Sequence, residues 1–128
     1  MSLKEAIQSA GAISDRSTCA AKTNAYGWGI TSANPGRKAS FLIISRDSQN
    51  CRRQLGGDVY AVKLKAKRGG HECKVDVKDQ NDGTYLAEYT VPENLDPSPC
   101  GQYTLSVCLC GSHIMESPFV VHVAWAWW

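Results

Sequence analysis

The stretch VKDQNDGTYLAEYTV, residues 77–91, joins a polar turn to a strand in which apolar and polar residues alternate. Asn81, Asp82 and Gly83 are residue types that adopt the positive φ angles of a tight turn between neighbouring strands. Tyr85 and Tyr89 are four residues apart, so a β-strand places both side chains on one face, where they can pack inward. The pattern therefore predicts that Asp82 is a corner residue and not a catalytic acid.

The same period-two alternation recurs along the chain, and turn-forming Gly, Pro and Asn residues interrupt it. Seven candidate strands result, at residues 18–24, 38–46, 59–66, 72–78, 84–91, 102–109 and 118–124. In the sixth strand Tyr103, Leu105 and Val107 face one way, while Cys108 and Cys110 face the other. Short strands with one apolar face each predict an all-β fold, a seven-stranded antiparallel sandwich.

The two ends of the chain depart from this pattern. Residues 1–16 carry apolar side chains at helical spacing, which predicts a short N-terminal helical leader. We interpret this leader as the end of a longer coiled coil or as a cloning remnant. Residues 17–124 form the predicted domain. Residues 125–128 are a Trp-rich tail, which contacts the open end of the domain or a partner, unless it is a cloning artefact.

Composition and charge exclude several classes of protein. The chain has 128 residues, of which 43% are hydrophobic and 20% charged, and this suits one folded domain. Its net charge of +2 is too small to demand a polyanionic partner. A run of about 18 apolar residues would predict a membrane span, and the chain contains none, so we expect no membrane partner.

The cysteines invite two readings, a disulfide framework and a metal site. Six cysteines are few for a secreted disulfide-rich protein of this length, and no glycosylation acceptor is present, so we expect reduced thiols in the cytoplasm, with a nuclear location left open. Cys108 and Cys110 resemble a zinc-binding pair, with Cys51, Cys100 or His113 as further ligands. Alternate residues on a strand, however, lie ~6.5–7 Å apart, which is wide for two zinc ligands. We expect no metal and no cofactor.

Two segments carry a resemblance to a known family: KDQNDGTYLAEYTV and CGQYTLSVCLCGSHIMESPFVVHV. They are similar to the hallmark segments of the filamin-type (ABP280) repeat, and the similarity extends over about residues 17–124. The positions that match its pattern are Gly83, Tyr85, Tyr89, Gly101, Tyr103, Gly111, Ile114, Ser117, Pro118 and Phe119. The resemblance implies an immunoglobulin-like sandwich without catalytic residues.

A narrower resemblance concerns Gly56-Gly57-Asp58 before the third strand, and the cysteine-bearing sixth strand followed by His113-Ile114. These features look like the single filamin domain of tripartite-motif E3 ubiquitin ligases. In that family the domain follows a RING, B-boxes and a coiled coil. The resemblance implies that ligase chemistry lies in zinc-binding domains outside this chain. It also implies that the full-length protein is a dimer through its coiled coil, and that this domain helps recruit a substrate or partner.

The resemblance also implies a binding surface, because filamin-type repeats accept an extended peptide beside their third strand. Strand addition uses unpaired backbone groups for affinity and alternate side chains for selectivity. One side of the expected groove would be lined by Val59, Ala61, Lys63 and Lys65, and the other by Lys74, Asp76 and Lys78. Such a surface favours a peptide in which small apolar residues alternate with acidic ones.

The lysines of this region support other interpretations as well. Lys63, Lys65, Lys74 and Lys78, together with arginines at positions 52 and 53, offer cations to the phosphates of RNA. Lysines on an edge strand also deter pairing with stray strands, and no aromatic residues interleave them for base stacking. A structural spacer, or a repeat of an actin-crosslinking filamin, is a further alternative.

Overall fold

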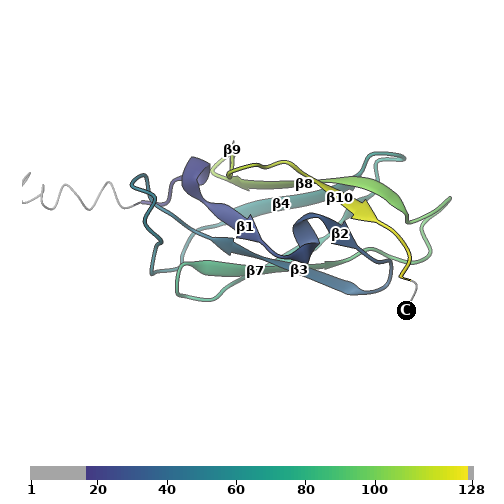
Figure 1. The fold of residues 1–128 in the computed structure, drawn as a ribbon, viewed down its shortest axis with the longest axis horizontal. Helices are drawn as coiled ribbons and strands as arrows, with labels where there is room; N and C mark the ends of the chain where they lie inside the picture. The colour runs from purple at the N-terminus through teal and green to yellow at the C-terminus, as the bar shows by residue number, and fades with distance from the viewer. Residues whose placement is uncertain (1–16, 127–128) are drawn as a thin grey trace, which may run out of the picture.

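Alternating apolar residues build two β-sheets that pack face to face in the computed structural model, which describes residues 17–126 (Figure 1). The first sheet contains, in spatial order, β1 (Asn24–Tyr26), β3 (Lys38–Ile44), β7 (Thr84–Thr90) and β6 (Val75–Asp79). The second contains β2 (Ser32–Ala33), β10 (Phe119–Val123), β8 (Gly101–Leu109), β4 (Tyr60–Ala66) and β5 (Glu72–Cys73), and β9 (Ser112–His113) pairs with β8. The predicted all-β sandwich is confirmed.

The strand count and pairing differ from the prediction in two respects. The strand expected at 72–78 is divided, because β5 pairs with β4 in the second sheet, whereas β6 pairs with β7 in the first. The chain changes sheets at Lys74, between the two short strands. The sandwich is also not wholly antiparallel, because β2, which was not predicted, runs parallel to β10.

The first predicted strand, 18–24, is largely wrong. A 3₁₀ helix, η2, occupies Ala20–Lys22, and β1 begins only at Asn24. The cause is local: the Thr23 hydroxyl donates to the Cys19 carbonyl at 2.9 Å, and the Thr23 N–H donates to the same carbonyl at 3.1 Å. These bonds close a turn before the strand can start, as Ser and Thr side chains often do near their own backbone. A second 3₁₀ helix, η3, spans Trp28–Ile30.

The core lies between the sheets and consists of the side chains that the alternation turns inward. Ile43 of the first sheet and Leu64, Leu105 and Val107 of the second are fully buried. Burial of each such side chain contributes roughly 1.5–3 kcal/mol to the stability of the fold. The Tyr60 and Tyr85 rings meet edge to face across the two sheets, with centroids 4.9 Å apart.

The turn between β6 and β7 is a closely packed, hydrogen-bonded corner. Asn81 and Gly83 have φ angles of 63° and 89°. The Asp82 carboxylate accepts the Thr84 N–H at 2.9 Å, and hydrogen bonding from the Thr84 hydroxyl holds the pKa of Asp82 below its usual range. A Cβ at Gly83 would collide with the Arg53 carbonyl oxygen, so glycine is required there for space as well as for its φ angle.

The predicted helical leader, residues 1–16, lies outside the described residues. Within residues 17–126 no helix is long and apolar enough to cross a membrane. At the other end, the chain after β10 is tied to β2 because the Ala124 N–H donates to the Ala33 carbonyl at 3.1 Å.

Candidate peptide-binding edge

The outer edge of β4 is only partly covered. On one side β4 pairs with β8 along its whole length, from Tyr60 to Ala66. On the other side β5 pairs with it only at Leu64 and Lys65. Among the strands of residues 17–126, none is hydrogen-bonded to the remaining edge, residues 60–63.

The backbone groups of Val62 point toward this open edge. The Ala66 N–H donates to the His71 carbonyl at 2.7 Å, away from β8, and every second residue of a strand directs its backbone groups the same way. The partner of Val62 on β8 gives independent support: the Val107 carbonyl accepts the Ile114 N–H at 2.9 Å, on the side of β8 opposite β4. Val62 therefore offers one donor and one acceptor to an added strand.

The first sheet presents a second open edge, at β6. The Gln80 N–H donates to the Thr84 carbonyl at 3.1 Å, so even-numbered residues of β6 face β7. Val75 and Val77 consequently direct their backbone groups outward, away from β7. Between the two edges lies a cavity of about 340 Å³, lined by Val62, Lys63, Glu72, Cys73, Lys74 and Val75. Val62 and Val75 are half-buried and supply its apolar surface.

The seven residues predicted to line the groove are not all brought to it. Lys63 and Lys74 contribute to the lining of the cavity. Ala61 and Lys65 lie on the outer face of the second sheet, since the alternation of β4 turns Tyr60 and Leu64 inward. Val59 precedes the first residue of β4 and is 82% exposed.

On the other strand, Asp76 and Lys78 lie on the outer face of the first sheet. Asp76 there forms an exposed ion pair with Lys74, with a nitrogen–oxygen distance of 3.6 Å. The lysines of β4 and β6 thus occupy the outer faces of two different sheets and do not form one continuous strip. Val62 and Val75 were missed as groove residues, because along their own strands they alternate like core residues.

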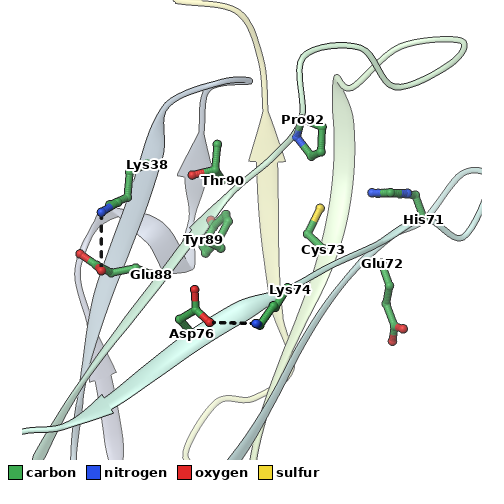
Figure 2. A pocket seen from close by; sticks show the side chains of 10 residues that line it. All are labelled: Lys38, His71, Glu72, Cys73, Lys74, Asp76, Glu88, Tyr89, Thr90 and Pro92. Atoms are coloured by element: carbon green, nitrogen blue, oxygen red, sulfur yellow. Dashed lines mark ion pairs between the residues drawn. The ribbon is translucent and has the colours of Figure 1, made fainter.

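A neighbouring cavity of about 410 Å³ lies beyond the point where the chain changes sheets, and Figure 2 shows its lining. Two ion pairs flank it, Lys74–Asp76 and Lys38–Glu88, the latter with a nitrogen–oxygen distance of 3.8 Å. Burial raises the pKa of the Cys73 thiol and of the Tyr89 hydroxyl, so both groups are neutral near pH 7. The Tyr89 hydroxyl donates to the Gly29 carbonyl at 2.7 Å and is thus a packing group, not an acid or base.

The remaining motif positions lie around the ends of β8 and β10. Tyr103 is buried, and its hydroxyl donates to the Pro99 carbonyl at 2.8 Å. Ile114 is buried, and the Ser117 hydroxyl oxygen accepts the Val107 N–H at 2.9 Å. Phe119, directly after Pro118, packs half-buried against the core. Gly101 and Gly111 have positive φ angles of 136° and 84°.

The Trp-rich tail is described only as far as Ala126. Trp125 is 45% exposed and lines a hollow of about 960 Å³ together with Tyr26 of β1 and Trp28 of η3. Trp127 and Trp128 lie outside the described residues. Within residues 17–126, no group of three or more Cys, His, Asp or Glu side chains is placed to hold a metal ion.

Comparison with known families agrees with the sandwich fold. The model of the Filamin/ABP280 repeat matches residues 17–120, which include every strand up to the first residues of β10. This chain belongs to the filamin repeat family. Among solved structures, the filamin domain resembles the Lin-41 filamin domain with a TM-score of 0.70, at 18% identity, over 85% of this chain and 98% of that one. It also resembles the bacterial integrin-binding protein invasin with a TM-score of 0.62, at 18% identity, over 87% of this chain and 20% of that one.

Curated relatives are longer proteins. The filamin domain is 38% identical over 118 residues to the E3 ubiquitin-protein ligase TRIM71 of Xenopus tropicalis, over 92% of this chain. It is 32% identical over 114 residues to the E3 ubiquitin-protein ligase TRIM45 of Bos taurus, over 88% of this chain. The chain spans only 14% and 19% of these two relatives. The similarity is therefore to the filamin domains of these ligases and does not extend to the rest of their chains.

Proposed function

We propose that this filamin domain is a noncatalytic protein-interaction module, which binds an extended peptide along residues 60–63 of β4. The observation that carries the proposal is the open edge, where the N–H and C=O of Val62 face outward beside an apolar groove. A strand added there pairs with Val62, and its inward side chains contact Val62 and Val75. Its outward side chains lie beside Ala61 and Lys63, which favours acidic residues at those positions.

The setting that we propose is a tripartite-motif E3 ubiquitin ligase, in which the domain recruits a substrate or partner. The similarity to TRIM71 and TRIM45 supports this setting. The six cysteines, all free thiols, are in keeping with a cytoplasmic protein. The flanking sequence of the full-length protein tests the setting directly: we expect upstream Cys/His zinc patterns and heptads, whereas tandem copies of this domain would contradict it.

The peptide site is tested with Val62→Pro, which removes the outward N–H but no bond to β8. The probe is a short peptide in which valine and glutamate alternate, and its affinity is measured by calorimetry. We expect a loss of affinity of about tenfold or more, because one hydrogen bond is removed and the added strand is displaced. Val75→Asp, which places a charge in the groove, should weaken binding as well.

Lys78→Ala is the matched control, since Lys78 lies on the outer face of the first sheet and does not line the groove. It should bind the peptide as the wild type does. If Val62→Pro binds with unchanged affinity while the domain remains folded, the peptide lies elsewhere and the edge proposal is wrong. Amide chemical shifts that move along β4 and β6 on titration with the peptide would give the positive result at residue level.

A further inference from the structure

Three polar side chains gather on the outer face of the second sheet, on β8, on β9 and in the turn before β10. Cys108 near the end of β8 is the register partner of His113 on β9. The neighbours of Cys108 on the strand, Val107 and Leu109, turn into the core, so its thiol faces outward. Ser117 follows in the turn before β10 and reaches back to the same histidine.

These three side chains contact one another in sequence, from Cys108 to His113 to Ser117. The Cys108 Sγ lies 3.6 Å from the His113 Nδ1, and this nitrogen lies 2.7 Å from the Ser117 Oγ. The Ser117 Oγ in turn accepts the main-chain N–H of Val107 at 2.9 Å. The backbone therefore fixes the serine, and the serine orients the imidazole against the thiol. A thiol beside a base is the arrangement that activates cysteines in proteins. Here the thiol and the serine share one nitrogen of the imidazole, which holds the ring beside the sulfur.

The surroundings of Cys108 leave its sulfur accessible and add positive charge. Ala61 of β4 lies opposite Cys108 and presents only a methyl group. Lys63 lies opposite Ser106, which makes it a diagonal neighbour of Cys108 on the same face, and such strand positions are ~7–8 Å apart in an antiparallel sheet. A lysine on this face attracts an anionic reagent.

The other cysteines lack this arrangement. Cys73 is buried, and burial raises the pKa of its thiol. Cys51 is exposed, and its contact is with the Gln49 carbonyl at 4.0 Å. Within residues 17–126, Cys108 is the cysteine whose sulfur lies within contact distance of an imidazole.

We propose that Cys108 is a reactive thiol that forms a mixed disulfide with a small anionic disulfide of the oxidised-glutathione type. In the resting state the Ser117 O–H donates to the His113 Nδ1. This nitrogen has one lone pair, so the Ser117 O–H turns away as the Cys108 thiol proton passes to it, and the new Nδ1–H donates to the Ser117 Oγ. The thiolate sulfur then attacks one sulfur of the glutathione disulfide. The original S–S bond breaks as the new one forms, and the departing glutathione thiolate leaves with the bonding electrons and takes up a proton. The disulfide is the oxidant, so no other co-reactant is needed.

The test uses the full 128-residue chain and oxidised glutathione, with modified sites located by peptide mapping at successive times. We expect Cys108 to be modified about tenfold faster than Cys51 or Cys110, because neither of those is paired with a base. His113→Gln should lower the rate at Cys108 to that of Cys51. Iodoacetamide at pH 7 provides a second rate that does not depend on a disulfide reagent.

Two substitutions serve as controls. Cys110→Ser removes the neighbouring exposed thiol and should leave the rate at Cys108 unchanged. His122→Gln removes an exposed histidine of the same sheet and should also have no effect. Thermal unfolding shows whether each variant is folded. Equal rates at Cys108 and Cys51, or an unchanged Cys108 rate in folded His113→Gln, would overturn the proposal; modification confined to Cys110 would do so too.

Discussion

The corner at residues 79–85 and the open edge of β4 are both rich in polar groups, but they treat these groups in opposite ways. At the corner, the Asp79 carboxylate accepts the N–H groups of Gly57 and Asn81, both at 2.8 Å. The Tyr85 hydroxyl accepts the Asp58 N–H at 2.9 Å. At the edge, the N–H and C=O of Val62 face outward with no strand hydrogen-bonded to them in residues 17–126. Polar groups that already have hydrogen-bond partners within the domain stabilise the fold. Backbone groups without a paired strand can form hydrogen bonds with a partner.

The largest expected effect is at the corner. Gly83→Ala should lower the free energy of unfolding by roughly 3–5 kcal/mol, because the new Cβ meets the Arg53 carbonyl and the residue keeps a φ of 89°. Urea denaturation measures the change. Gly69→Ala is the matched control, with a φ of 79° but no atom within 4 Å of the new Cβ, and should cost about 1 kcal/mol. Equal losses in the two variants would show that the corner is not tightly packed.

The second effect is a difference in stability between proline substitutions on the two sides of β4. Ala61→Pro removes an N–H that faces β8 and should cost about 3 kcal/mol of stability. Val62→Pro removes one that faces the open edge and should cost less than about 1 kcal/mol. Chemical denaturation of both variants gives the comparison. If Val62→Pro proves the more damaging substitution, the direction of the backbone groups along β4 has been assigned wrongly.

The smallest effect concerns Tyr60, which begins β4 and contacts the corner through the Tyr85 ring. Burial raises the pKa of Tyr60 from 10.0 to about 12, and its hydroxyl lies 2.5 Å from the Ser45 Oγ. Because the folded pKa exceeds the unfolded value, this contribution to stability is complete below pH 10 and is lost as the pH rises toward 12. The measurement is the melting temperature as a function of pH between 10 and 12, where it should fall in the wild type. In Tyr60→Phe this fall should be smaller. Tyr26→Phe, at an exposed position, should leave the decline intact.

Local patterns predicted the corner well, since the turn residues and the two tyrosines act over a few positions. The buried faces of β8 and β10 followed from period-two alternation for the same reason. The groove was harder to predict, because Val62 and Val75 look like core residues along their own strands. Only the change of sheet at Lys74 brings their edges together. The predicted lysines were exposed, but exposure alone does not say which of two opposite faces a side chain occupies.

The pairing of β5 with Leu64 and Lys65 has a consequence for what can dock beside β4. Because β5 already occupies the edge at Leu64 and Lys65, a bound peptide can pair with β4 only along Tyr60–Lys63. Beyond that point the peptide must turn away or end. The exposed carboxylate of Glu72 on β5 lies where the peptide must end, and it repels an acidic residue at that position. Recognition by this domain would then depend on where the peptide ends. A short peptide with an uncharged last residue would pair with β4 in a single register.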